Sequence, residues 1–93
     1  MRADIRHEPQ AQRFVIDSDG GTALLQYREL DAHGTLDFNH TYTPPALRGS
    51  GIASQLAEHA LRYAREHGYK VVPSCPFIAT FIARHPEYRD LLA

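Results

Sequence analysis

The stretch Leu47-Arg48-Gly49-Ser50-Gly51-Ile52-Ala53-Ser54 has glycines at a spacing that suits phosphate binding. It follows Pro44 and Pro45, and residues with helical periodicity come after it. Glycine lets the backbone approach an anion closely, and the first free N–H groups of a helix point toward that anion. The sequence therefore predicts an anion site where this turn meets the helix.

Two common phosphate-binding motifs do not fit this stretch. A P-loop ends in Gly-Lys-Ser/Thr, and the stretch contains no lysine. A dinucleotide fingerprint would need glycine where Ser54 stands, and an acidic residue at the end of the next strand, which here ends in Val72-Pro73-Ser74. Nucleoside triphosphates and dinucleotides are therefore disfavoured as ligands.

The residues before the turn alternate in the manner of β-strands. We expect strands at residues 4–7, 13–16, 22–30 and 35–43, with turns at residues 17–21 and 31–34. Because the connections are short, the strands should form an antiparallel meander. In the last strand one face is expected to hold Leu36, Phe38, His40 and Tyr42, and the other Asp37, Asn39, Thr41 and Thr43.

The residues after the turn have the period of a helix. Apolar residues fill one side of a helix over residues 51–67, and Gly68 is a favourable stop. A short strand at residues 69–72 ends at Pro73, a second helix covers residues 77–84, and Pro86 opens a last helical turn. The sequence thus predicts an α+β fold with a mixed sheet: a meander of about four strands, then helix, strand and helix.

Composition limits the classes of function. The 93 residues predict a single domain, residues 1–93, and a net charge of −1 gives no basic excess for binding nucleic acid or a membrane surface. One cysteine, Cys75, excludes an internal disulfide, and the histidines lack metal-ligand spacing, so we expect no metal. The histidines other than His40 are expected to be surface or capping residues: His7, His33, His59, His67 and His85. Without an apolar N-terminal run, the default expectation is a cytoplasmic protein.

Residues 48–53, RGSGIA, match the pattern Gln/Arg-x-x-Gly-x-Gly/Ala and resemble the acyl-coenzyme A loop of the Gcn5-related N-acetyltransferase superfamily. The runs TPPALRGSGIASQLAEHAL, VVPSCPF and HPEY are similar to a small, minimal subgroup with Pro-x-Cys and His-Pro-Glu-Tyr motifs. The resemblance implies an acetyltransferase-like fold with splayed central strands. The usual family has two helices between its first two strands, and the lack of room for them here implies an open acceptor site.

The resemblance also implies the cofactor and the residues that bind it. The cofactor would be acetyl-coenzyme A or coenzyme A, with its pyrophosphate at the turn and its pantetheine between the strands at residues 36–43 and 69–74. The residues implied in cofactor binding are Tyr42, Thr43, Leu47, Arg48, Gly49, Ser50, Gly51, Ile52, Ala53 and Ser54.

On this mapping His40 and Cys75 lie near the acetyl group and are the candidate catalytic residues. His40 would be a general base or a hydrogen-bonded core residue. Cys75 would be a nucleophile or proton relay, with His40 as its partner, or a small buried residue. Many family members use a tyrosine on the last helix to protonate the leaving thiolate. The corresponding helix here offers Phe77 and Phe81, so Cys75 or water would have to serve.

The sequence thus indicates a small N-acetyltransferase that moves acetyl from acetyl-coenzyme A to an amine of a small molecule or protein. The alternative is a non-catalytic adaptor or sensor module that binds an acyl-coenzyme A. The sequence specifies neither the acceptor nor the oligomeric state.

Overall fold

The structure, a computed structural model, describes residues 4–30 and 34–93. In chain order, its elements are β1 (Arg6–Glu8), β2 (Arg13–Ser18), β3 (Gly21–Leu30), β4 (Thr35–Tyr42), η1 (Pro45–Leu47), α1 (Ile52–Glu66), β5 (Lys70–Val72), α2 (Pro76–Arg84) and η2 (Pro86–Leu91). The predicted order of four strands, helix, strand and helix is confirmed. Residues 31–33 of the turn expected between β3 and β4 lie outside the described residues.

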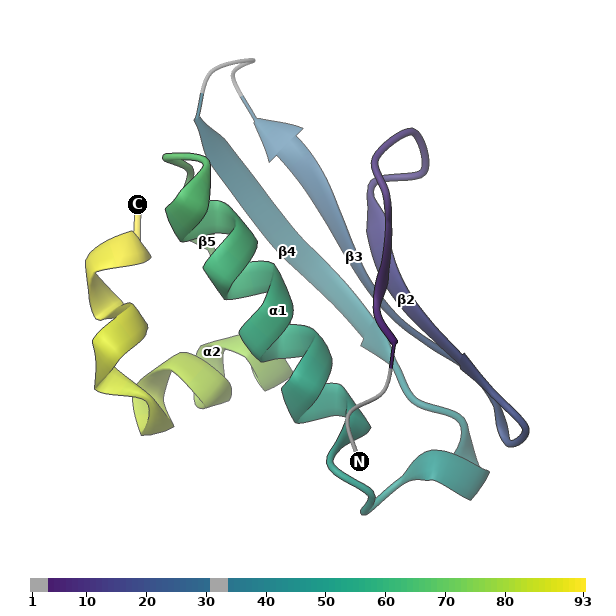
Figure 1. Ribbon diagram of the computed structural model, residues 1–93. Coiled ribbons are helices and arrows are strands. Elements are labelled where there is room, and N and C mark those ends of the chain that lie inside the picture. The colour runs from purple at the N-terminus through teal and green to yellow at the C-terminus, as the bar shows by residue number, and fades with distance from the viewer. Residues whose placement is uncertain (1–3, 31–33) are drawn as a thin grey trace.

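The five strands form one sheet in the order β1-β2-β3-β4-β5 (Figure 1). The first four are antiparallel, as the short connections predicted, and β5 pairs parallel to β4. A tight turn joins β1 to β2, where Ala11 N–H and Gln12 N–H donate to the carbonyls of Glu8 and Pro9 at 3.1 Å. This turn leaves no place for a helix between these two strands. At the other edge Val71 of β5 bridges to Leu92, just after η2.

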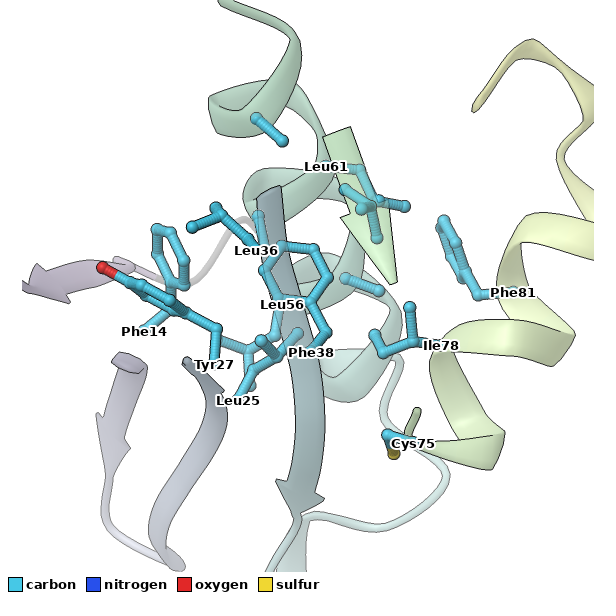
Figure 2. Close-up of a cluster of buried hydrophobic side chains, with 14 of the residues drawn as sticks. Phe14, Leu25, Tyr27, Leu36, Phe38, Leu56, Leu61, Cys75, Ile78 and Phe81 are labelled. Carbon is cyan, nitrogen blue, oxygen red and sulfur yellow. The ribbon is translucent and has the colours of Figure 1, made fainter. Parts of the chain in front are cut away.

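The apolar core lies on one face of the sheet. α1 crosses that face, and α2 and η2 lie beside α1 (Figure 1). Figure 2 shows Phe14, Leu25, Leu36 and Phe38 of the strands packed with Leu56 of α1. Within residues 4–30 and 34–93, no helix covers the opposite face of the sheet, which we call the uncovered face. A helix with one apolar stripe can bury one sheet face only, so a second helical layer would be needed to cover both.

A β-bulge in β4 changes which side chains share a face. Phe38 is opposite Tyr27, but His40 is opposite Gln26, so Asn39 is an extra residue without a register partner. A bulge shifts the two-residue period of a strand by one. Phe38 is fully buried, whereas His40 and Tyr42 are exposed. The expectation that His40 and Tyr42 lie on the apolar face with Leu36 and Phe38 was therefore wrong.

The short strand β1 is held to α1 through the ring of His7. This ring stacks on Phe14 with 4.3 Å between centroids and meets Tyr63 of α1 edge-on at 4.6 Å. Its Nε2 lies 2.7 Å from the hydroxyl oxygen of Tyr27. Burial lowers the pKa of His7, and the nearby His59 and His67 lower it further. His7 is therefore a packing residue, and its interpretation as a surface or capping residue was wrong.

Candidate functional site

The turn between η1 and α1 has the backbone conformation that its glycines allow. Gly49 has φ +81° and Gly51 has φ +85°, both in the left-handed region that residues with a Cβ avoid. A Cβ built on either glycine would meet no atom within 4 Å. The glycines are therefore needed for the shape of the turn, and the space beside them is open to a ligand.

The N-terminus of α1 faces this open space without a cap of its own. Gly51 is the N-cap residue, no side chain among the described residues caps the first N–H groups of the helix, and no acidic residue lies in its first turn. The first backbone bond within the helix runs from Gln55 N–H to the carbonyl of Gly51, at 3.0 Å. The N–H groups of residues 52–54, in the first turn of the helix, are left for a ligand, and the helix dipole favours an anion there.

Two side chains of the turn, those of Arg48 and Ser50, form hydrogen bonds to nearby backbone carbonyls. Arg48 Nε donates to the carbonyl of Thr43 at 3.1 Å, so the guanidinium ties the start of the turn to its middle. The Ser50 hydroxyl donates to the carbonyl of Leu47. Both bonds are internal and exposed, which indicates that these two side chains hold the turn in shape.

A cavity of about 300 Å³ opens on the turn and the first turn of α1. It brings together the residues that the sequence assigned to cofactor binding, apart from Tyr42 and Ser50. Phe77 of α2 also forms part of the wall. The sequence indicated no binding role for it, only that it cannot donate a proton as a tyrosine would. The lining residues are Thr43, Leu47, Arg48, Gly49, Gly51, Ile52, Ala53, Ser54 and Phe77.

The strands β4 and β5 separate next to this cavity. They pair over three positions, and the last pair is Asp37 with Val72. One more bond follows, from Cys75 N–H to the carbonyl of Phe38 at 2.9 Å. Among the described residues, β5 offers no pairing partner to residues 39–42 of β4. The splayed central strands that the resemblance implied are therefore present.

Cys75 and His40 lie on different faces of the sheet. Cys75 is 7% exposed, belongs to the apolar core, and precedes α2 as its N-cap residue (Figure 2). Its sulfur lies 3.5 Å from Thr41 Oγ1, which shows that Thr41 points to the core side of β4. The neighbouring His40 points the other way, onto the uncovered face. The expected pairing of Cys75 with His40 was wrong, and Thr41 takes the place of His40 beside the thiol.

Two residues near the splay point received no role from the sequence. Thr41 was assigned to the wrong face because the bulge at Asn39 leaves no mark in the alternation of residue types. Asp37 is 8% exposed, and its buried Oδ1 has no hydrogen-bond partner in the part of the chain that the structure describes. The only sequence signal for a role of Asp37 was that a charged residue stands close to the predicted end of a strand.

Two other features are not found among the described residues. No group of three or more His, Cys, Asp and Glu side chains in residues 4–30 and 34–93 could hold a metal ion. None of the helices in this part of the chain has the length and apolar character needed to cross a membrane.

Comparison with known proteins identifies the fold. A solution structure of a GCN5-like putative N-acetyltransferase from Staphylococcus aureus superposes with a TM-score of 0.77. The two sequences are 25% identical, and the match covers 98% of this chain and 88% of that one.

Sequence relatives and a family model agree with this match. Protein NATD1 of Danio rerio is 33% identical over 93 aligned residues, which cover 96% of this chain and 84% of the relative. Protein NATD1 of Mus musculus is 32% identical over 84 residues, covering 88% of this chain and 76% of the relative. The model of the GCN5-related N-acetyl-transferase family matches residues 13–91. The chain therefore belongs to the GCN5-related N-acetyltransferase family.

Proposed function

We propose that this small N-acetyltransferase takes its acetyl group from acetyl-coenzyme A and binds the pyrophosphate at the turn of residues 47–54. The observation that carries the proposal is the turn itself. Two glycines with positive φ leave open space above a helix N-terminus that has no cap and no acidic residue. These features fit an anionic ligand that needs close backbone contact. Arg48 supports the site by bracing the turn at Thr43.

Calorimetry with acetyl-coenzyme A tests the binding site. We expect binding to the wild-type chain, and weaker binding to Gly51→Ala because φ +85° is strained for alanine. Desulfo-coenzyme A keeps the pyrophosphate and lacks the acyl thioester, so it should still bind. Absence of binding at millimolar acetyl-coenzyme A would contradict the cofactor assignment.

The residues at the splay point supply groups for proton transfer. Bound acetyl-coenzyme A provides an acetyl thioester, and the attacking amine must lose its proton before it can attack. His40 lies on β4 beyond the last β4–β5 pair and its exposed ring is accessible to an acceptor, so we assign it as the base. On the other side of β4, the thiol of Cys75 lies 3.5 Å from Thr41 Oγ1. We assign this pair as the source of a proton for the leaving group.

Kinetics of thiol release against a panel of amines test these roles. We expect His40→Gln to lower kcat by roughly 100-fold, the lower range for the loss of a general base, and to leave the Kd for acetyl-coenzyme A unchanged. Thiol release at the wild-type rate by both His40→Gln and Cys75→Ala would show that neither residue takes part.

The acceptor is an amine of a small molecule or protein, and family membership favours an enzyme over an adaptor that only binds the donor. A cytoplasmic location is part of the proposal, since the free thiol of Cys75 suits a reducing compartment. Cell fractionation followed by detection of the chain tests this location, and its recovery outside the cytoplasmic fraction would contradict it.

A further inference from the structure

The uncovered face carries a row of polar side chains along β4. Leu36 and Phe38 are buried in the core, so Asp37 between them faces the other way. Beyond the bulge, His40 lies on this same uncovered face, because Thr41 is turned inward to Cys75. The bulge thus places Asp37 and His40 on one face, on either side of the point where β4 and β5 separate.

Asp37 has an unusual environment for a carboxylate. It is 8% exposed, and among residues 4–30 and 34–93 its Oδ1 has no hydrogen-bond partner and no ion pair includes it. Its register partners are Arg28 on β3 and Val72 on β5. Leaving a buried carboxylate oxygen unpaired costs free energy that a cationic donor can recover. The position therefore selects for a ligand that brings an N–H donor and a positive charge.

The surroundings of Asp37 leave a path for such a ligand. No helix of the described residues covers the face of β4 that carries Asp37, and its register partner Arg28 is exposed. The opposite face of β4 is filled by the core and by Cys75. The cavity at the turn is assigned to the acetyl donor, so the uncovered face, with Asp37 and His40, is the separate approach for an acceptor.

We propose that Asp37 is the recognition residue for the acceptor, and that the acceptor is a primary alkylammonium of the lysine side-chain type that enters across the uncovered face. This inference rests on the proposed function, since it names the acceptor class of the same site. The ammonium donates to Asp37 Oδ1 and is held beside His40, which removes its proton. Arg28, the exposed register partner of Asp37 on β3, brings a positive charge to the same face and competes with the ammonium.

A binding experiment tests the inference without the acetyl donor. N-α-acetyl-lysine amide is titrated into the full chain, and the Asp37 carboxyl carbon and the Val72 amide are followed by NMR. We expect saturable shifts at both, at least tenfold weaker binding to Asp37→Asn because a charge-assisted hydrogen bond is lost, and severalfold tighter binding to Arg28→Gln. The matched control Glu66→Gln, an exposed carboxylate at the end of α1, should bind like wild type.

The contradicting results of this titration are equally specific. Equal affinity for wild type and Asp37→Asn, shifts confined to other residues, or no saturation by the wild-type chain would each overturn the inference. So would equal affinity for the N-α,N-ε-diacetyl-lysine amide, which keeps the chain but lacks the charge. Thermal unfolding of each variant checks that the fold is retained, and Asn is close in shape to Asp.

A kinetic experiment separates recognition from proton transfer. With lysine amide as acceptor we expect Asp37→Asn to raise KM about tenfold and to leave kcat within about twofold of wild type, with the Kd for acetyl-coenzyme A unchanged. A fall in kcat at unchanged KM would place Asp37 in proton transfer and overturn its recognition role. If the wild-type chain does not bind acetyl-coenzyme A, the proposed function is contradicted. The NMR titration, which contains no acetyl donor, would still decide the role of Asp37.

Discussion

Thr41 Oγ1 lies 3.5 Å from Cys75 Sγ, and this contact joins β4 beyond its bulge to the residue that precedes α2. It crosses the gap where the two strands have ceased to pair. The Thr41 hydroxyl can orient the thiol proton, and the thiol is otherwise surrounded by the apolar core. The contact is therefore a candidate for a proton relay that acts as a unit.

A double-mutant cycle tests whether the two side chains act together. We expect Cys75→Ala to lower kcat by roughly 100-fold, as the loss of a general acid does, and Thr41→Val to lower it less. Because the hydroxyl works through the thiol, the double variant should be no slower than Cys75→Ala alone. Cys75→Ser, which keeps an O–H donor, is the matched control and should recover part of the rate. Additive losses would contradict the relay.

Three glycines with the same backbone strain separate stability from ligand binding. Gly49, Gly51 and Gly68 have φ between +76° and +85°, and a Cβ on any of them would meet open space. Each change to alanine should lower the free energy of unfolding by about 1–2 kcal/mol, the cost of left-handed backbone for a residue with a Cβ. Gly68 follows the far end of α1, so Gly68→Ala should bind acetyl-coenzyme A like wild type.

The loop variants should differ from that control in binding. We expect Gly49→Ala and Gly51→Ala to weaken acetyl-coenzyme A binding at least tenfold, because strain displaces the N–H groups that face the cavity. Calorimetry and urea unfolding measure the two effects separately. Weakening by Gly68→Ala to the same extent would assign the loss to general destabilisation.

His7 should make the protein less stable in acid. Burial first, and then His59 and His67, lower its pKa in the folded chain below the value of about 6.5 in the unfolded chain. The unfolded chain therefore takes up the proton first as the pH falls, so the contribution of His7 is present above about pH 6.5 and is lost below it. Urea unfolding at pH 7.5, 6 and 5 should show a smaller loss for His7→Phe, which keeps a ring and cannot titrate.

A second variant tests the cause of the lowered pKa. His67→Gln removes one neighbouring positive charge, so NMR titration should show a higher pKa for His7 in that variant. Equal acid sensitivity of wild type and His7→Phe would show that other groups control stability in this pH range.

Tyr27 should make the protein less stable in alkali. Burial first, and then Tyr63 and Tyr69, raise its pKa from 10.0 to about 12. The folded chain keeps the phenolic proton longer than the unfolded chain, so stability is present below about pH 10 and is lost as the pH rises through about 12. Tyr27→Phe should lose about 1 kcal/mol at neutral pH, since its bond with His7 is gone, and should depend less on pH above 10. A tyrosinate absorbance titration that shows every tyrosine ionising near pH 10 would contradict the raised pKa.

Local sequence patterns predicted the helices, the strands and the turn, but not the face of the sheet on which every side chain lies. The periodicity around Leu56 and Leu61 gave α1 nearly to its ends, and Gly49 and Gly51 marked the turn with left-handed backbone before it. The bulge at Asn39 depends on how β3 and β4 pair, which no local pattern reports, so His40 and Thr41 were placed on the wrong faces.

The same limit applies to single residues whose surroundings come from distant segments. The pattern around His7 is that of a short polar strand, and its stacking on Phe14 and Tyr63 appears only when β1, β2 and α1 meet. Asp37 looks like an ordinary solvent-facing residue of an alternating strand. Its burial depends on neighbours across two other strands, which the sequence does not place.

The bridge between Val71 and Leu92 limits the backbone pairing of a second molecule at this edge of the sheet. The bridge and the bond from Ala93 N–H to the Val71 carbonyl, at 3.0 Å, occupy part of the outer edge of β5. At the other edge β1 has only three residues. Short or occupied edges give a neighbouring chain little backbone on which to extend the sheet. They therefore protect the protein against strand-to-strand aggregation, even though no helix of the described residues covers one face of the sheet.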